Sequence, residues 1–181
     1  AVASLAARLR RHGHDARAVL PFYRSVREQA IETRVSLDSM CVVMGQGEEW
    51  CAVHETECGG VPAMLLENHR FFDRPGLYHD SQMRDYSDNP RRFGFLCRAA
   101  LQWCMDGGFA PDIVHCHDWQ AALAPMYLKA WFWNHPVLGK AASVLTIHNI
   151  AYQGAYPAAH AAYLGIGPDS FTEDKFESYG G

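Results

Sequence analysis

The sequence of 181 residues has no long apolar run and little excess of charge of either sign. A membrane-spanning helix needs roughly 20 mostly apolar residues, whereas the mean hydropathy here is −0.20. No apolar segment of the kind found in secretory signals follows the arginines near the start of the chain. These absences predict a soluble, cytoplasmic protein that does not contact a membrane.

Basic residues are scattered rather than clustered along the chain. Lysine and arginine total 16 against 20 acidic residues, and the net charge is −4. Sequence-independent binding of nucleic acid needs a basic stripe or patch, so no nucleic-acid partner is expected. The short basic run at 8–11 is better explained as the solvated face of a first helix.

The six cysteines lack the C-x-x-C spacing of zinc ribbons and thioredoxin-like sites. A chain this long and apolar does not need disulfides to fold, so free thiols are expected, with neither a metal nor a cofactor. The cysteines are Cys41, Cys51, Cys58, Cys97, Cys104 and Cys116.

Hydrophobic residues make up 49% of the chain, which is enough for one sizeable core but too little for two ordinary domains. The sequence begins inside a helical pattern without an initiator methionine and stops at two glycines after an unfinished segment. We therefore expect residues 1–181 to be part of a longer protein.

The first half of the chain alternates helical and strand patterns. Apolar residues over 2–11 follow helical spacing, and a short apolar run at 16–20 follows after a glycine, as in an α/β layer. Three β-prone runs at 35–44, 49–57 and 61–67 are separated by glycines and predict a hairpin that feeds a third strand. The segment from 69 to 88 resembles a loop.

The second half continues the alternation. An Asn-Pro pair predicts a helix over 89–106 with Asn89 as its N-cap. A short strand at 113–116, a helix over 119–130 and a strand at 143–147 follow. Helices that connect strands in this way favour a doubly wound parallel sheet, a Rossmann-like α/β fold with a β-hairpin insertion.

Two of the predicted strands end in polar clusters, at 115–119 and at 146–149. Ligands of open parallel sheets bind at the carboxyl ends of the strands, so a site is expected there. Simpler explanations stand beside this one. Asp118 is suited to be a helix N-cap, Trp119 could be a core residue, and His148 could be a buried, satisfied histidine.

Other residues of the first cluster admit different chemistry. His115 and His117 alternate along a strand and could share a metal, but no third ligand at typical spacing is apparent. Cys116 could be a nucleophile, although a packed thiol on a buried strand is more common. The polar loop at 73–80 contains groups that recognise sugars, which by itself is a weak signal.

Four segments resemble motifs of one family, the bacterial glycogen synthases and plant starch synthases of glycosyltransferase family 5. Residues 11–21 read RHGHDARAVLP and resemble RRGHDVRVLLP, and residues 72–78 read FDRPGLY, as in the family. Residues 112–120 read DIVHCHDWQ and resemble DVVHxHDWH, and residues 146–154 read TIHNIAYQG and resemble TIHNLAYQG. The motifs occur in the family's order and cover nearly the whole chain.

The resemblance implies the N-terminal half of a GT-B fold, in which two Rossmann-like domains face each other across a cleft. It implies an ADP-glucose-dependent hexosyltransferase of glycogen or starch synthesis that transfers glucose to the nonreducing 4-OH of an α-1,4-glucan with retention. Donor and acceptor would be the partners, together with the C-terminal domain. A noncatalytic glucan-binding module, or another GT-B transferase of the sucrose or trehalose type, is the alternative.

Carried over to this sequence, the resemblance implies a catalytic His148 beside the transferred glucose. Its neighbour Asn149 would bond a sugar hydroxyl. The resemblance implies a second catalytic position at Asp118, which with Trp119 would shape the acceptor side of the cleft. An oxocarbenium-like transition state would be favoured by oriented dipoles in such a cleft.

The resemblance places Tyr78 and His79 near the glucose and the glucan, as substrate-binding residues.

The sequence departs from the family's pattern at one position and lacks two of its parts. Gln120 stands where many members of the family have histidine. The family's Lys-Thr-Gly-Gly-Leu loop, which would bind the donor's phosphates, would precede Ala1, and the sequence contains no second Rossmann-like domain. The isolated chain is therefore expected to be inactive.

Overall fold

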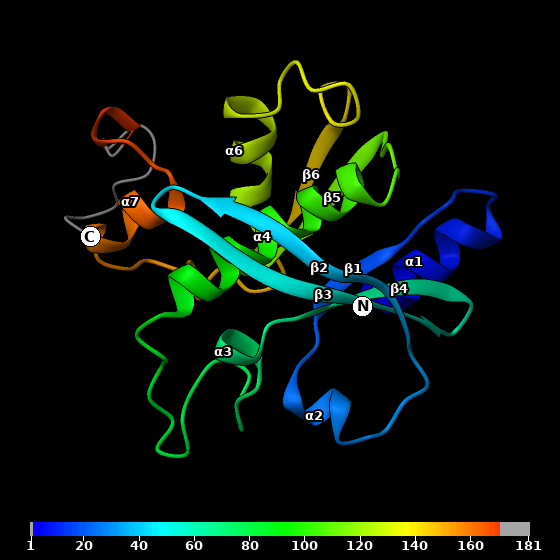
Figure 1. Cartoon of the computed structure of the whole chain (residues 1–181), viewed down its shortest axis with the longest axis horizontal. Coiled ribbons are helices and arrows are strands. Elements are labelled where there is room, and N and C mark those ends of the chain that lie inside the picture. Colours follow the sequence, from blue (N-terminus) through cyan, green and yellow to red (C-terminus); the bar gives the residue numbers. More distant parts are fainter. Residues whose placement is uncertain (1, 171–181) are drawn as a thin grey trace. The chain divides into compact units, whose positions relative to one another are not determined.

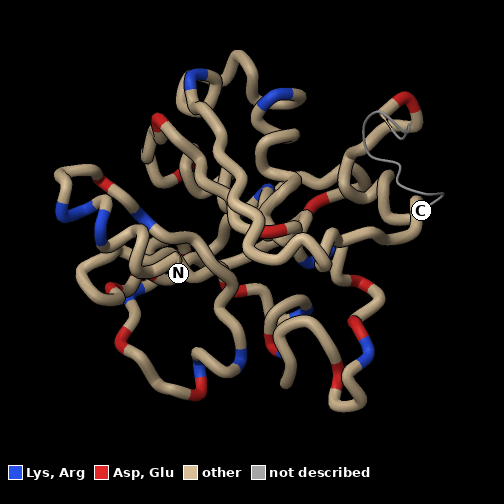
Figure 2. Tube along the Cα trace, turned by 180° about the vertical axis from the view of Figure 1, so that it is seen from behind, with Lys and Arg blue, Asp and Glu red and all other residues tan. Residues whose placement is uncertain are grey.

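A computed structural model of the chain describes residues 2–170. The chain divides into two compact units, one of Ala1–Met40 and Trp50–Arg84 and one of Cys41–Glu49 and Asp85–Gly181. Each unit is described here by itself. Among residues 2–170, the helices lack the length and apolar character of a membrane span. Along residues 2–170, Figure 2 shows lysines and arginines interspersed with aspartates and glutamates.

The first unit contains helix α1 (Val2–Arg11) and the strand β1 (Ala18–Pro21). The predicted β-prone runs form β2 (Arg34–Met44), β3 (Gly47–Cys58) and β4 (Val61–Glu67), in the sheet order β1-β4-β3-β2 (Figure 1). β4 runs parallel to β1 and antiparallel to β3. The hairpin and its third strand are confirmed, and the third strand joins the sheet that begins with β1.

A short helix, α3 (His69–Phe72), lies in the segment that the sequence pattern assigned to a loop. Asn68 caps it, since the Oδ1 of Asn68 accepts the backbone N–H of Phe71 at 3.0 Å. Phe71 and Phe72 are 0% exposed. The helix forms because a cap and two adjacent aromatic side chains fix one turn of backbone, a signal too short for periodicity to reveal.

In the first unit, ion pairs join a short helix after β1 to the end of β4 and to the residue that follows α3. A second short helix, α2 (Arg24–Arg27), supplies both arginines. Arg24 Nε lies 2.8 Å from Asp73 Oδ1, and Arg27 Nη1 lies 2.9 Å from Glu67 Oε1. Asp73 is thus held in place at the start of the FDRPGLY segment by a guanidinium 49 positions earlier in the sequence.

The second unit is built on helix α4 (Asn89–Asp106) and two parallel strands, β5 (Ile113–His117) and β6 (Ala142–Thr146). Two helices connect the strands, α5 (Asp118–Ala121) and α6 (Leu123–Ala130). Figure 1 shows β5 and β6 side by side with α6 next to them. Strand, helix and parallel strand is the arrangement that the sequence pattern predicted.

Up to residue 170, the remaining helical turns of the second unit follow β6. They are a 3-10 turn at Ala158–His160, α7 (Ala161–Leu164) and a 3-10 turn at Pro168–Ser170. The buried Tyr127 of α6 donates its hydroxyl to the carbonyl oxygen of Leu164 at 2.8 Å. This bond ties the segment after β6 to the helix before it.

Two details differ from the expected helices. Asn89 lies inside α4 rather than at its N-cap, which is Asp88. Asn89 is fully buried, and its Oδ1 accepts Arg92 Nη1 at 2.6 Å. The single helix expected over 119–130 is interrupted at Ala122. Pro125 explains the break, because proline has no N–H to continue the hydrogen bonds of α5.

The tip of the β2–β3 hairpin, Cys41–Glu49, belongs to the second unit. Gly45 donates its backbone N–H to the carbonyl oxygen of Tyr163 at 2.9 Å. A Cβ on Gly45 would lie 2.2 Å from the carbonyl oxygen of Ala162. Arg98 of α4, only 5% exposed, donates its Nε to the carbonyl oxygen of Val43 at 3.1 Å. Because the backbone of position 45 comes this close to the carbonyl oxygen of Ala162, only glycine fits at the tip.

The cysteines are all free. Four of them, Cys51, Cys97, Cys104 and Cys116, are buried, Cys41 is partly buried, and Cys58, the last residue of β3, is exposed.

Candidate functional site

The carboxyl ends of β5 and β6 meet at one edge of the second unit. His117, the last residue of β5, lies opposite Thr146, the last residue of β6. The residues that follow each strand, Asp118 and His148, are therefore brought to the same place. This is the edge at which ligands of parallel sheets bind.

A hydrogen bond joins the two segments that leave the strands. The Oδ1 of Asp118 accepts the backbone N–H of His148 at 2.7 Å. The N-cap of α5 is His117, and that helix end has no side-chain cap hydrogen bond. The prediction that Asp118 caps the helix is therefore wrong, because its carboxylate is used across the strands.

The backbone of Asp118 is itself unusual, with φ at +57°. Only a few per cent of non-glycine residues adopt this left-handed region, and aspartate and asparagine do so more readily than most. Strained backbone of this kind costs about 1–3 kcal/mol and clusters at functional sites. This conformation turns the chain sharply at the end of β5. At this position the Asp118 carboxylate accepts the His148 N–H from the segment that follows β6.

Three imidazoles stand next to one another at this edge, and we term His115, His117 and His148 the histidine column. The rings of His115 and His117 are stacked, with centroids 4.4 Å apart and planes 20° apart. The rings of His117 and His148 are also stacked, at 5.4 Å and 22°. His117 Nδ1 lies 3.1 Å from His148 Nε2, within hydrogen-bonding distance.

The histidine column ends on a hydroxyl. His115 Nε2 lies 2.7 Å from Thr146 Oγ1. Burial lowers the pKa of His117, and the positive charge that His115 and His148 can carry lowers it further. The middle imidazole therefore stays neutral near pH 7, so it retains one acceptor nitrogen.

Neither alternative chemistry of the first cluster is supported. Within the described part of the chain, no group of three histidine, cysteine or acidic side chains is arranged to hold a metal ion. Cys116 is 3% exposed, and burial raises the pKa of its thiol to about 11. A thiol with such a pKa is not a nucleophile at neutral pH.

Trp119 is half-buried and packs between α4 and the chain after β6. Its ring meets Phe93 edge-on with centroids 5.0 Å apart and lies 5.3 Å from the ring of Tyr156. A Cβ on Gly154 would lie 2.7 Å from the Trp119 ring, so backbone covers part of the indole. Trp119 also lines a cavity of about 280 Å³ in the second unit. Its packing role is thus established, beside any role toward a ligand.

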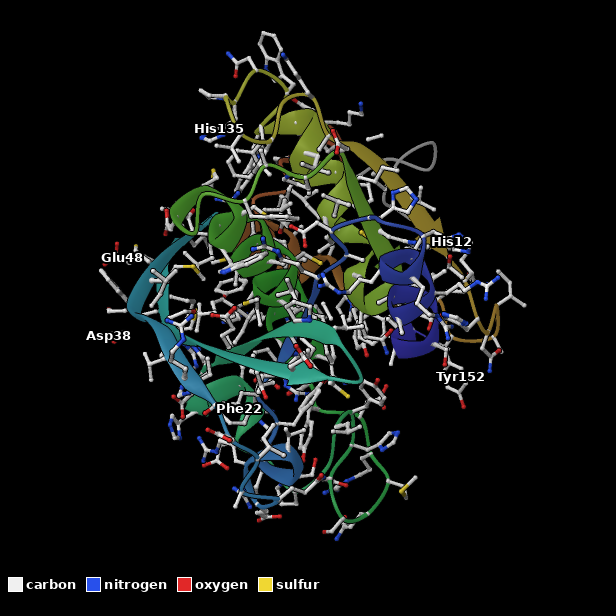
Figure 3. All side chains as sticks on the ribbon, turned by 90° about the vertical axis from the view of Figure 1, so that its right-hand side faces the viewer. His12, Phe22, Asp38, Glu48, His135 and Tyr152 are labelled. Atoms are coloured by element: carbon white, nitrogen blue, oxygen red, sulfur yellow. The ribbon has the colours of Figure 1, made fainter. Side chains whose placement is uncertain are left out.

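His148 and Asn149 are both exposed where β6 ends. The Oδ1 of Asn149 accepts the backbone N–H of Ala151 at 3.0 Å, which forms a local turn. The side-chain nitrogen of Asn149 is the group available to a ligand. Tyr152 is 69% exposed on the same loop (Figure 3).

The structure groups four of the six predicted site residues in the second unit: Asp118, Trp119, His148 and Asn149. The other two, Tyr78 and His79, belong to the first unit. They are half-buried neighbours whose rings meet edge-on with centroids 6.0 Å apart.

Sequence reasoning considered His117 only as a metal ligand and missed its contact with His148. The signal that could have revealed this contact is the register between β5 and β6. Histidines at alternate positions of β5 share one face, and the same face of β6 leads through Thr146 to His148. A parallel pairing of the two strands would have placed the rings together.

The whole chain, residues 1–181, matches the family described as the starch synthase catalytic domain. It is 42% identical over 179 residues to glycogen synthase 2 of Geobacter metallireducens, covering 99% of the chain and 37% of that protein. It is 42% identical over 178 residues to glycogen synthase 2 of Geobacter sulfurreducens, covering 98% of the chain and again 37% of the relative. The chain thus spans little more than a third of the length of these relatives.

The fold has a counterpart of known structure, the catalytic domain of starch synthase IV from Arabidopsis thaliana bound to ADP and acarbose. The TM-score is 0.82 at 27% identity, over 96% of this chain and 35% of that one. The Rossmann-like α/β architecture and the N-terminal half of a GT-B fold are thereby confirmed. With its full length matched by the family, the chain belongs to the starch synthase catalytic domain family of glycosyltransferases.

Proposed function

We propose that this chain forms the acceptor side and the glucose pocket of a glycogen or starch synthase. The intact enzyme would transfer glucose from ADP-glucose to the nonreducing 4-OH of an α-1,4-glucan with retention. The observation that carries the proposal is the 2.7 Å bond from His148 N–H to Asp118 Oδ1, which holds His148 and Asn149 at the ligand-binding edge of the parallel strands.

His148 would contact the transferred glucose. As glucose leaves the diphosphate, positive charge develops on its ring, and a neutral imidazole with an unshared electron pair favours that state whereas an imidazolium opposes it. Asn149 would donate its side-chain N–H to a sugar hydroxyl, since its Oδ1 is already used by the Ala151 backbone. Fixed dipoles placed in this way need no reorganisation during the reaction.

The donor assignment draws on the solved relative, whose structure holds ADP and acarbose. We propose ADP-glucose as donor and an α-glucan as acceptor by analogy with it. The chain itself has a net charge of −4 and, in its described residues, an interspersed charge pattern. The groups that bind the donor's diphosphate would therefore be supplied mainly from outside this chain, by the rest of the intact enzyme.

A chimera tests the proposal. The matching 179 residues of the Geobacter metallireducens glycogen synthase 2 would be replaced by this chain, and ADP release from ADP-glucose would be followed with glycogen as acceptor. We expect glycogen-dependent turnover, slower release of UDP from UDP-glucose, and a product whose new bonds are α-linked. A folded chimera that binds glycogen without transferring glucose would contradict the proposal and favour a glucan-binding module.

A further inference from the structure

The contact between His117 Nδ1 and His148 Nε2, 3.1 Å long, joins two rings that are each able to donate or accept. In a pair of neutral imidazoles, one nitrogen of the contact must carry the proton and the other must be bare. Each ring carries only one proton when neutral. The choice made at this contact therefore also determines the state of the far nitrogen of each ring.

Because the contact joins Nδ1 of one ring to Nε2 of the other, both rings must adopt the same tautomer. If His148 donates, both are protonated at Nε2 and the Nδ1 of His148 is bare. If His117 donates, both are protonated at Nδ1 and His148 presents a donor there. Within residues 2–170, Nδ1 of His148 has no hydrogen-bonding partner, so this nitrogen is open to a ligand.

The intrinsic chemistry of imidazole favours protonation at Nε2. Protonation at Nε2 is the more populated form of a free neutral imidazole side chain, and the pair can satisfy that preference in both rings at once. The far end of the column does not oppose it, since the Thr146 hydroxyl near His115 Nε2 can accept as well as donate. His117 stays neutral because burial lowers its pKa, so its Nδ1 can accept.

We propose that His117 is a positioning residue that fixes His148 as the Nε2–H tautomer and so directs a bare Nδ1 toward the substrate. Asp118 holds the His148 backbone at 2.7 Å, and His117 holds the ring at 3.1 Å. His115 stacks on His117 and restricts the tilt of its ring. The unshared electron pair on Nδ1 of His148 would face either a sugar hydroxyl or the electron-poor sugar ring. This identification of the ligand rests on the proposed function.

The tautomer can be measured directly in this chain. In ¹⁵N-labelled protein, long-range ¹H–¹⁵N correlation spectra separate protonated from bare imidazole nitrogens, and His148→Gln identifies the signals of His148. We expect a bare Nδ1 and a protonated Nε2 in His148. A protonated Nδ1 in His148 would overturn the proposal.

Three variants distinguish positioning from packing. His117→Phe keeps a flat ring but removes the acceptor, and we expect the two nitrogens of His148 to show averaged shifts. His117→Asn offers an amide oxygen near the place of Nδ1 and should restore the single tautomer. His115→Phe is the matched control, since it changes the stack but not the contact with His148. Unchanged His148 shifts in folded His117→Phe would contradict the role given to His117.

The same variants in the chimera supply a kinetic measurement. Loss of one hydrogen bond corresponds to about tenfold in rate, so His117→Phe should lower kcat about tenfold, with KM little changed and His117→Asn largely rescuing it. Equal losses in His117→Phe and His115→Phe would reduce His117 to a packing residue. If the chimera transfers no glucose, the proposed function fails, yet the spectra still decide the tautomer.

Discussion

At the scale of single residues, two contacts hold His148. Asp118 accepts a hydrogen bond from its backbone N–H, and His117 lies within hydrogen-bonding distance of its ring. The side chain of His148 is exposed rather than packed in a core. A histidine that served only the fold would instead have its ring buried and its nitrogens satisfied. The buried-histidine explanation of the sequence pattern is therefore wrong.

Replacing His148 should affect catalysis more than stability. A preorganised polar group at a developing charge typically contributes on the order of 10²–10³ in kcat. We expect His148→Ala in the chimera to lower kcat by about that factor, with a much smaller change in the donor's KM. Tm should hold within a few degrees, because the side chain is exposed. An early melt with kcat retained would show a structural role.

The Asp118 side chain accepts a hydrogen bond from the His148 backbone and also carries a negative charge. Two substitutions distinguish the effect of the bond from the effect of the charge. Asparagine can still accept the His148 N–H and tolerates a positive φ, so Asp118→Asn should fold normally while kcat falls about fivefold through the weaker, uncharged bond. Asp118→Ala should cost about 2 kcal/mol of unfolding free energy, because the bond is lost and the left-handed backbone becomes strained. Full activity in Asp118→Asn would leave only the structural role.

At the scale of elements, the tip of the β2–β3 hairpin depends on one backbone contact. Gly45→Ala would place a methyl group 2.2 Å from the carbonyl oxygen of Ala162, so the tip must move away from α7. We expect a loss of about 1–3 kcal/mol in denaturant unfolding. Gly47→Ala is a control for the turn itself, since a Cβ there meets nothing within 4 Å, although its φ of +115° adds strain. A smaller effect at Gly45 than at Gly47 would contradict the clash.

Periodicity and glycine positions were sufficient to predict the strands and longer helices of the described chain. They failed where the decisive signal was a single residue. Pro125 interrupts the helix after β5, and Asn68 starts a one-turn helix that no periodic pattern reveals. The fold class was predictable because alternation is repeated many times, whereas an isolated cap or break depends on one bond.

For the whole molecule, the sequence predicted that candidate site residues gather at the ends of β5 and β6, but it did not predict the bonds between them. The bond from His148 N–H to Asp118 Oδ1 depends on strand register and on the positive φ of Asp118, neither of which appears in a pattern of residue types. The contribution of Tyr78 and His79 to the site rests on family resemblance alone and stays a prediction.

The chain alone should not synthesise glucan. Its described residues place candidate glucose-contacting groups together, but the proposed diphosphate-binding groups belong to the rest of the enzyme. Incubation of the 181-residue chain with ADP-glucose and glycogen should release ADP no faster than a His148→Ala control. Turnover comparable with that of the chimera would show that this chain carries the complete catalytic machinery.

The uneven burial of the cysteines makes the molecule easy to label at one place. Cys58 is exposed at the end of β3, while burial raises the pKa of Cys51 and Cys97 to about 12 and of Cys116 to about 11. Burial and the neighbouring Glu48 also raise the pKa of Cys41. A maleimide dye should therefore attach first at Cys58, which gives one defined labelling position without any engineered cysteine.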